Sequence, residues 1–214
     1  MKFKAIAWRI SLCVCLIVFV LSQGCAYNVI LDPNITPTVN ISNRIDLKVG
    51  LFISEEMKSF KLSDKADYLT KYTFEIGTSL ENIVLKATRS VFSSVEVLQS
   101  YPTQQMLVEK QLALFIVSSI TSGSISLNVE PGFFSSDAKG STTLSVQMNF
   151  YTHEMVQLAS IGASGMGVAS EGYVLSTGKK EYSASVERAV RNLGNELVQQ
   201  MYGNYDVRTF AEQQ

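Results

Sequence analysis

The stretch Ser141-Thr-Thr-Leu-Ser-Val-Gln-Met-Asn-Phe-Tyr-Thr152 decides the fold, because its apolar and polar residues alternate over most of its length. Leu144, Val146, Met148 and Phe150 have one parity, while threonine, serine, glutamine and asparagine occupy the positions between them. A period of two is typical of a β-strand with one buried and one solvated face, the usual arrangement in antiparallel sheets. We therefore expect a core strand here, with neighbouring strands close by in the chain.

Both flanks of this strand contain further extended segments. Residues 158–169 are rich in alanine, glycine and serine and can pair with the central strand as a hairpin. Upstream, Pro131-Gly132 predicts a turn, and a loop is expected over residues 135–140. Other apolar or alternating runs predict strands at residues 46–53, 94–98, 112–119 and 124–130.

Two segments have the spacing of amphipathic helices. Residues 78–92 carry apolar residues three and four positions apart, so that one face of the helix is apolar. Thr78 and Glu81 form a capping-box pattern at its start. Residues 184–202 carry a second apolar stripe of the same kind.

The ends of the second helix have their own signals. Ser183 or Ser185 can serve as its N-cap, and Gly203 lies where a C-terminal glycine is expected. Gly194 lies inside the helix, where glycine costs about 1 kcal/mol relative to alanine. We expect it to mark a close approach to another element.

The order of elements is strand, helix, five strands, helix. It predicts an α+β fold, a two-layer sandwich in which a mostly antiparallel sheet carries both amphipathic helices on one face. A chain of 214 residues suits one such domain, which we assign to residues 45–203. Residues 54–72 are charged and polar and predict a surface loop, and residues 204–214 predict a polar C-terminal tail.

The N-terminus has the layout of an export signal. Lys2, Lys4 and Arg9 are the only charges in residues 1–24, and residues 10–21 form an apolar run. A positive segment followed by an apolar run of about 7–15 residues is typical of a secretory signal. The run is shorter than the roughly 20 residues that a membrane-spanning helix needs. We expect the whole segment to be removed.

Gly24-Cys25 resembles the end of a bacterial lipoprotein signal peptide, whose cleavage box is Leu-(Ala/Ser)-(Gly/Ala)-Cys. Gln23 departs from that box, and Leu21 lies one place too early. The resemblance implies cleavage before Cys25 and acylation of this cysteine with palmitate-type chains. An ordinary signal peptide with an incidental cysteine and an uncleaved anchor are the alternatives.

The other cysteines favour lipidation of Cys25. Cys13 and Cys15 lie inside the signal, and no cysteine follows Cys25, so the mature chain has no partner for a disulfide. Acylation explains the lone thiol, and two or more acyl chains anchor a protein stably where one does so only marginally. Ala26 in place of aspartate implies, for that family, the outer membrane. Residues 25–44, with their prolines and asparagines, predict an extended tether. Its apolar residues Val29, Ile30, Leu31 and Ile35 indicate that part of it packs as an edge strand.

The net charge of the mature chain limits the classes of partner that we expect. Once the three basic residues of the signal are lost, 15 basic and 19 acidic residues remain, a net charge of −4. No stripe of lysine and arginine is evident, so nucleic acid is not an expected partner. The bilayer and other envelope proteins, or a second copy of the chain, are the expected partners.

Three segments resemble parts of small outer-membrane lipoproteins with a periplasmic α+β domain, such as the curli-secretion and lipopolysaccharide-assembly lipoproteins. They are Asp46-Leu-Lys-Val-Gly-Leu-Phe-Ile53, Ser94-Val-Glu-Val-Leu98 and Ala189-Val-Arg-Asn-Leu-Gly-Asn-Glu-Leu197. The resemblance covers roughly residues 45–202 and lies in the order of elements. It implies a domain that faces the periplasm and takes part in export or outer-membrane biogenesis.

No catalytic constellation is apparent in the sequence. His153 is the only histidine, and the His-Glu-x-x-His zinc motif would need a second one at the position of Gln157. Ser164 lies in a glycine-rich segment, but Met166 occupies the place of the second glycine of a nucleophile elbow. We therefore predict a protein that is not an enzyme and holds no metal or cofactor.

Phe133-Phe134 follows the predicted turn and is the best candidate for contact with a membrane or a partner. The alternative is that both rings fold back onto the core. Our first hypothesis is a non-catalytic structural or assembly component of the envelope. A binding module for a lipid, glycan or peptide, with a groove between helix and sheet, is the second, and an envelope hydrolase using Ser164 and His153 is the third.

Overall fold

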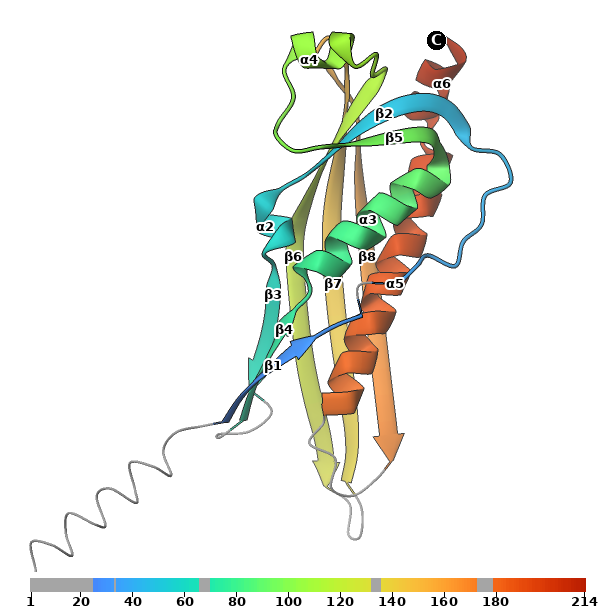
Figure 1. Ribbon diagram of the computed structural model, residues 1–214. Coiled ribbons are helices and arrows are strands. Elements are labelled where there is room, and N and C mark those ends of the chain that lie inside the picture. Colours follow the sequence, from blue (N-terminus) through green and yellow to red (C-terminus); the bar gives the residue numbers. More distant parts are fainter. Residues whose placement is uncertain (1–24, 33, 66–69, 132–135, 173–178) are drawn as a thin grey trace, which may run out of the picture.

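Figure 1 shows the computed structural model of the protein, which describes residues 25–32, 34–65, 70–131, 136–172 and 179–214. The strands are β1 Cys25–Ile30, β2 Ile45–Ile53, β3 Lys61–Lys65, β4 Thr70–Glu75, β5 Phe92–Leu98, β6 Leu114–Pro131, β7 Ser136–Thr152 and β8 Gln157–Gly172. The helices are α2 Glu55–Lys58, α3 Gly77–Val91, α4 Gln104–Glu109, α5 Lys179–Gly203 and α6 Tyr205–Glu212. The expected signal at residues 1–24 and the Phe133-Phe134 pair lie outside the described residues.

The large sheet has the strand order β5-β2-β6-β7-β8. β6, β7 and β8 form a long antiparallel meander, and the predicted hairpin is confirmed, with Ser145 opposite Ser164. β2 instead runs parallel to both of its neighbours, β5 and β6. The sheet is therefore mixed, and the prediction that it is mostly antiparallel is wrong for this half. The reason is that α3 and α4 lie in crossover connections, which return the chain in the same direction.

The two layers are the sheet and the pair of helices α3 and α5, which lie on the same face (Figure 1). Leu144, Val146, Met148 and Phe150 are all buried on this face of β7, as their alternation predicts. The apolar stripes of α3 and α5 are buried against them. The prediction of an α+β sandwich with both helices on one face is thus confirmed.

A second, three-stranded sheet was missed by the sequence analysis. Its order is β1-β4-β3, with β1 parallel and β3 antiparallel to β4. The prediction of a surface loop over residues 54–72 is wrong for the described part, which forms α2, β3 and the start of β4. Leu62, Tyr72 and Phe74 are buried, but they are spaced among charged residues, so the local pattern did not reveal them.

β6 is one continuous strand where two had been expected. The serine- and glycine-rich middle of β6 contains a register irregularity between Ile120 and Ser122, yet pairing with β7 continues on both sides. The second sheet explains the small residues, because a Cβ on Gly123 would lie only 2.8 Å from the ring of Phe60. β7 likewise begins at Ser136, so the loop expected over residues 135–140 is wrong from that residue onward.

The predicted helix starts are wrong in detail. α3 follows Ile76, which makes no side-chain cap, so Thr78 and Glu81 do not form a capping box. α5 begins several residues before Ser185, whose buried hydroxyl donates to the Tyr182 carbonyl at 2.8 Å and contacts the Thr142 hydroxyl at 2.8 Å. Neither local capping signal therefore marks the start of its helix.

The C-terminal tail is helical. Asn204 caps α6 by accepting a hydrogen bond from Val207 N at 3.0 Å, and Val207 itself is buried. The residues expected to form a polar tail over 204–214 therefore fold as a short helix, which docks on the core through Val207 and through the partly buried Phe210 and Ala211.

α5 packs unusually close to β8, because glycines replace side chains between them. A Cβ on Gly165 would lie 2.5 Å from Leu193 N, and one on Gly167 would lie 2.5 Å from Ala189 N. The predicted close approach at Gly194 is also confirmed, because a Cβ there would lie 2.5 Å from Ile83 of α3. The backbones of strand and helix are therefore in van der Waals contact, and the groove expected between helix and sheet is closed along this section.

We predict that Gly165→Ala destabilises the fold strongly. The new methyl group would meet helix backbone, which cannot rotate away, so we expect a loss of about 3 kcal/mol or more in the free energy of unfolding. Urea denaturation followed by circular dichroism measures it. Gly162→Ala is the matched control, since a Cβ there meets no atom within 4 Å. Equal stability of the two variants would contradict the close packing.

Candidate functional site

The connection between Cys25 and the folded body is the feature that bears most directly on function. Cys25 is itself the first residue of β1, and its backbone lies opposite Thr70 of β4. The pairing continues without interruption to Ile30 opposite Glu75. The edge strand expected within the tether of residues 25–44 is therefore present as β1, and it begins at the cysteine itself.

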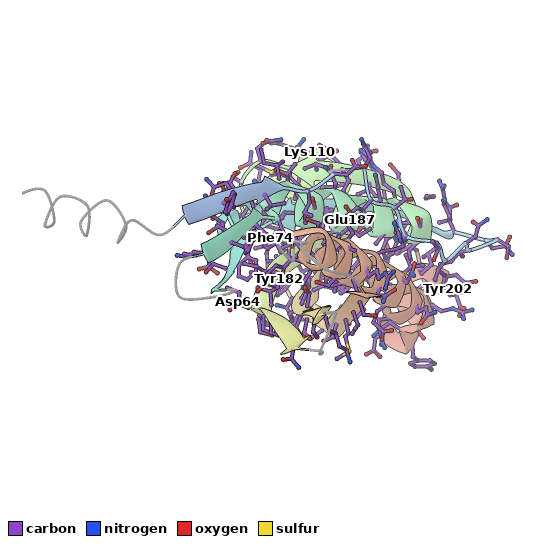
Figure 2. The ribbon with its side chains drawn as sticks, turned by 90° about the horizontal axis from the view of Figure 1, so that it is seen from below. Asp64, Phe74, Lys110, Tyr182, Glu187 and Tyr202 are labelled. Carbon is purple, nitrogen blue, oxygen red and sulfur yellow. The ribbon has the colours of Figure 1, made fainter. Side chains whose placement is uncertain are left out.

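Aromatic rings join β1 to the rest of the molecule. The ring of Tyr27 stacks on Tyr72, with centroids 5.5 Å apart, and Tyr72 contacts Tyr182 of α5 at 5.3 Å. Tyr182 also contacts Phe74 at 5.7 Å and donates a hydrogen bond to Asp64 Oδ2 at 2.8 Å. Figure 2, which views the molecule from below, shows Asp64, Phe74 and Tyr182 close together beside the second sheet. The second sheet is thus fixed to α5.

The segment after β1 is also held to the body. The side chains of Leu31 and Ile35 are buried in the core. Asn195 of α5 accepts hydrogen bonds from Thr38 N at 2.7 Å and Val39 N at 3.2 Å, and it donates to Thr38 Oγ1 at 3.0 Å. One asparagine side chain therefore clamps this segment to the helix.

Asn195→Ala should release the segment around Thr38. Three hydrogen bonds are lost, so we expect hydrogen exchange at Thr38 and Val39 to become faster by about tenfold or more, equivalent to 1–2 kcal/mol. Exchange measured by mass spectrometry tests this. Glu196→Ala on the same helix is the control, because the Glu196 carboxylate accepts a hydrogen bond from Gln200 within α5, whereas the segment around Thr38 bonds to Asn195. Unchanged protection in Asn195→Ala would contradict a clamping role.

The molecule is elongated and has two distinct ends (Figure 1). We call one the anchor end: it holds the start of β1 at Cys25, the β3 and β4 ends at Lys65 and Thr70, and the paired residues Pro131 and Ser136 of β6 and β7. We call the opposite one the distal end, formed by α4 and the β7–β8 turn at residues 153–156. The described parts of the chain thus place Cys25 at an extremity.

The distal end carries a small core of its own. Leu98, Leu107, Leu112 and Phe115 are buried beneath α4. Phe115 stacks on Tyr151 at 4.9 Å, and Tyr101 meets the edge of Phe115 at 5.8 Å. Partial burial raises the pKa of Tyr101 above its ordinary value, and the neighbouring Tyr151 adds to the shift.

Apolar side chains are exposed at the same end. Tyr101 is 51% exposed, and Val108 and Val156 are each 58% exposed. Large exposed apolar residues gathered at one end are typical of a contact surface. The sequence analysis missed them, because they come from three separate segments.

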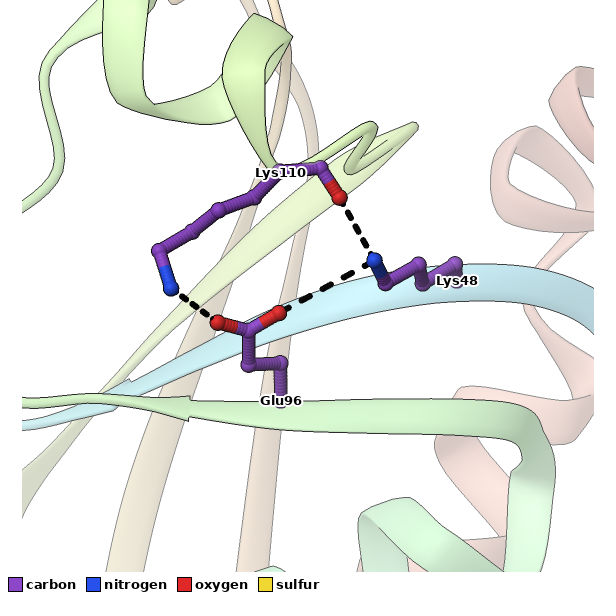
Figure 3. A network of polar contacts seen from close by, with 3 residues as sticks. All are labelled: Lys48, Glu96 and Lys110. Carbon is purple, nitrogen blue, oxygen red and sulfur yellow. Dashed lines mark hydrogen bonds and ion pairs between the residues drawn. The ribbon is translucent and has the colours of Figure 1, made fainter.

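A charged network ties the strands together near α4 (Figure 3). Glu96 of β5 forms an ion pair with Lys110 and lies 3.9 Å from Lys48 Nζ of β2. Lys48 Nζ also donates to the Lys110 carbonyl at 2.6 Å. All three side chains are partly exposed, so the network fixes local geometry and adds little stability.

An open cleft of about 330 Å³ lies between the start of β2 and the helices α5 and α6. Arg44 and Arg208 line it together with Asp46 and Glu212. Arg208 also lies over the ring of Tyr202, 5.7 Å from its centroid. The cleft is therefore polar and carries both signs of charge.

The two catalytic candidates are not brought together. His153 lies in the β7–β8 turn, while Ser164 is exposed in mid-β8 and shares a hydrogen bond of 2.9 Å with Ser145. Seven residues of β7 lie between Ser145 and His153, and the eight steps from one to the other span about 26 Å of extended chain. These residues therefore cannot act as a nucleophile and its base.

Two further searches concern only the described part of the chain. No three residues among its histidines, cysteines, aspartates and glutamates are grouped so that they could hold a metal ion. None of its helices combines the length and apolar character needed to cross a bilayer.

No protein-family model matches the chain, and no curated protein matches its sequence. Solved structures with a similar course of the backbone include a neuraminyllactose-binding hemagglutinin homolog from Helicobacter pylori, at 12% identity, 86% of this chain, 97% of that chain and a TM-score of 0.44. A minor lipoprotein from Acinetobacter baumannii is 10% identical, and the match covers 76% of this chain and 95% of that chain with a TM-score of 0.41. A chain of the PelC dodecamer from Paraburkholderia phytofirmans is 12% identical, and the match covers 75% of this chain and 93% of that chain with a TM-score of 0.32.

Proposed function

We propose that this protein is a bacterial lipoprotein, cut before Cys25 and held by acyl chains on that residue at the outer membrane, with its domain in the periplasm. In this proposal it is a non-catalytic structural or assembly component of the cell envelope. Its partners are envelope proteins or further copies of the chain.

The position of Cys25 supports this proposal most directly. The cysteine opens an edge strand at one extremity of the fold, so removal of residues 1–24 leaves the β1 pairing intact. A new N-terminus at this point costs no buried contact of the described residues. The lone thiol of the mature chain then has a chemical use.

The separation of His153 from Ser164, the two catalytic candidates of the sequence, favours a role in assembly over the hydrolase alternative. The distal end supplies exposed apolar residues that a partner protein could cover. The proposed resemblance to export and lipopolysaccharide-assembly lipoproteins points to the same class of function and remains a prediction.

Cys25→Ser should abolish labelling by radioactive palmitate and release the protein from the membrane fraction. The reason is that the acyl chains supply nearly all of the affinity of a stably anchored lipoprotein. Gel autoradiography and fractionation measure both effects. Cys13→Ser with Cys15→Ser is the control and should leave labelling intact, while persistent labelling of Cys25→Ser would contradict the assignment.

The assembly role itself is tested by crosslinking in cells followed by affinity purification and mass spectrometry. We expect a defined envelope partner or a homo-oligomer. A purely monomeric protein without any crosslinked partner would count against it.

Phe133 and Phe134 remain proposed membrane or partner contacts. Their neighbours Pro131 and Ser136 pair at the anchor end. Replacing both phenylalanines by serine in the unacylated mature chain should weaken its co-sedimentation with lipid vesicles by about tenfold, since burial of even one apolar ring contributes more than 1 kcal/mol. Unchanged sedimentation would assign the two rings to the core or to a protein partner.

A binding module is the second candidate function, and the cleft beside α6 is the observation that favours it. Arg44 and Arg208 with Asp46 and Glu212 suit a small polar ligand rather than a lipid tail. Native mass spectrometry of protein extracted from its own membrane would reveal a retained ligand, which Arg208→Ala should release.

A further inference from the structure

We propose that the acylated protein stands end-on on the bilayer, with the anchor end against the lipid surface and the distal end turned away from it. The proposal rests on acylation of Cys25 as put forward above. It adds a defined orientation and names the surface of the protein that meets the headgroups. The occupant of that surface is the bilayer, because the acyl chains proposed for Cys25 insert into it beside the start of β1.

The length of flexible chain between the acyl groups and the folded domain decides whether the domain can tumble. A flexible tether of 20 residues would have an end-to-end distance of about 25 Å and would let the domain tumble. Here β1 begins at Cys25 itself, and the backbone is already paired with Thr70 at that residue. The acyl chains are therefore attached to the sheet without an intervening linker.

The second sheet is fixed to the rest of the domain on two sides. The contact of Tyr72 with Tyr182 and the hydrogen bond from Tyr182 to Asp64 fix this sheet to α5. On its other side, Phe60 and Leu62 lie against β6 at Gly123, where only a glycine leaves room for them. A constraint on the position of Cys25 is thus a constraint on the whole domain.

The anchor end is the surface that meets the lipid headgroups in this proposal. In Figure 1 the start of β1 lies beside the end of β3 and the start of β4, and the ends of β6 and β7 lie to one side of them in the same lower part of the molecule. Lys71 near the start of β4 and Lys139 near the start of β7 are both exposed there. Glu130, Asp137 and Glu171 belong to the same strand ends, so the surface carries both signs of charge. A lysine near an anionic lipid surface contributes about 1 kcal/mol, and Lys71 and Lys139 therefore supply individual contacts with phosphate headgroups and not a basic patch.

The length of the strands sets how far the distal end stands from the lipid headgroups. β7 runs from the anchor end to the distal turn, and the stretch from Lys139 to Thr152 spans about 40 Å. Tyr101, Val108 and Val156 would therefore be held well clear of the headgroups. They are placed where a second envelope protein can reach them.

Depth-dependent quenching tests this orientation. Single cysteines are introduced into the full acylated chain at Lys71→Cys or Lys139→Cys, and at Val108→Cys or Val156→Cys as matched exposed positions of the distal end. Acylation blocks Cys25, so each new thiol is the only site for a fluorophore. The proteins are reconstituted in vesicles of phosphatidylethanolamine and phosphatidylglycerol that contain nitroxide-labelled lipid.

We expect loss of most of the fluorescence at positions 71 and 139 and no loss at positions 108 and 156. A glycine-serine linker of about 20 residues inserted between Cys25 and Ala26 should remove most of this contrast. Equal quenching at both ends of the chain without the linker overturns the proposal, and so does a contrast that the linker leaves unchanged.

Palmitate incorporation into the same samples distinguishes a failure of the proposed orientation from a failure of the lipoprotein assignment. Acylated protein with equal quenching overturns the orientation and leaves the lipoprotein assignment standing. A protein that takes up no palmitate overturns both.

Discussion

The contact between the small-residue face of β8 and the backbone of α5 is the constraint on which the rest of the structure depends. Gly165 and Gly167 let helix and strand approach without side chains between them. Ala163 and Ala169 of the same face are also buried, so the whole central part of β8 has little bulk. Interiors at this packing density leave no room for an added methyl group to be absorbed.

This contact also shapes the exposed edge of the sheet. Arg188 donates to the Val168 carbonyl and Asn192 donates to the Met166 carbonyl at 2.7 Å, so α5 covers outward-facing backbone groups of β8. Four residues of helix rise about 6 Å and two residues of strand about 6.6 Å, which is why the two bonds repeat in step. Covered edges protect a sheet from unwanted pairing. Near the start of α5, Tyr182 reaches the second sheet, so one helix organises both sheets and, through them, the position of Cys25.

The proposed function follows from the two ends of the molecule rather than from a cleft with chemistry in it. The residues that first suggested catalysis, His153 and Ser164, are held apart by the strand geometry. Cys25 and the exposed apolar residues of the distal end instead lie at opposite extremities. Such an arrangement suits a protein that links a membrane to something else.

The sequence by itself determined the central hairpin, the two amphipathic helices and the close approach at Gly194, and it indicated a role for Cys25 that stays a prediction. Each of these is a local signal: a period of two, a helical stripe, a glycine where alanine is favoured, and a lone thiol after an apolar run. Only the tertiary structure decided that β2 runs parallel to its neighbours, that charged residues 61–65 form a strand and that β1 begins at the cysteine. The physical reason is that these features are stabilised by contacts with residues far away in the chain, such as Tyr182 and Asn195, and local propensity carries no trace of such partners.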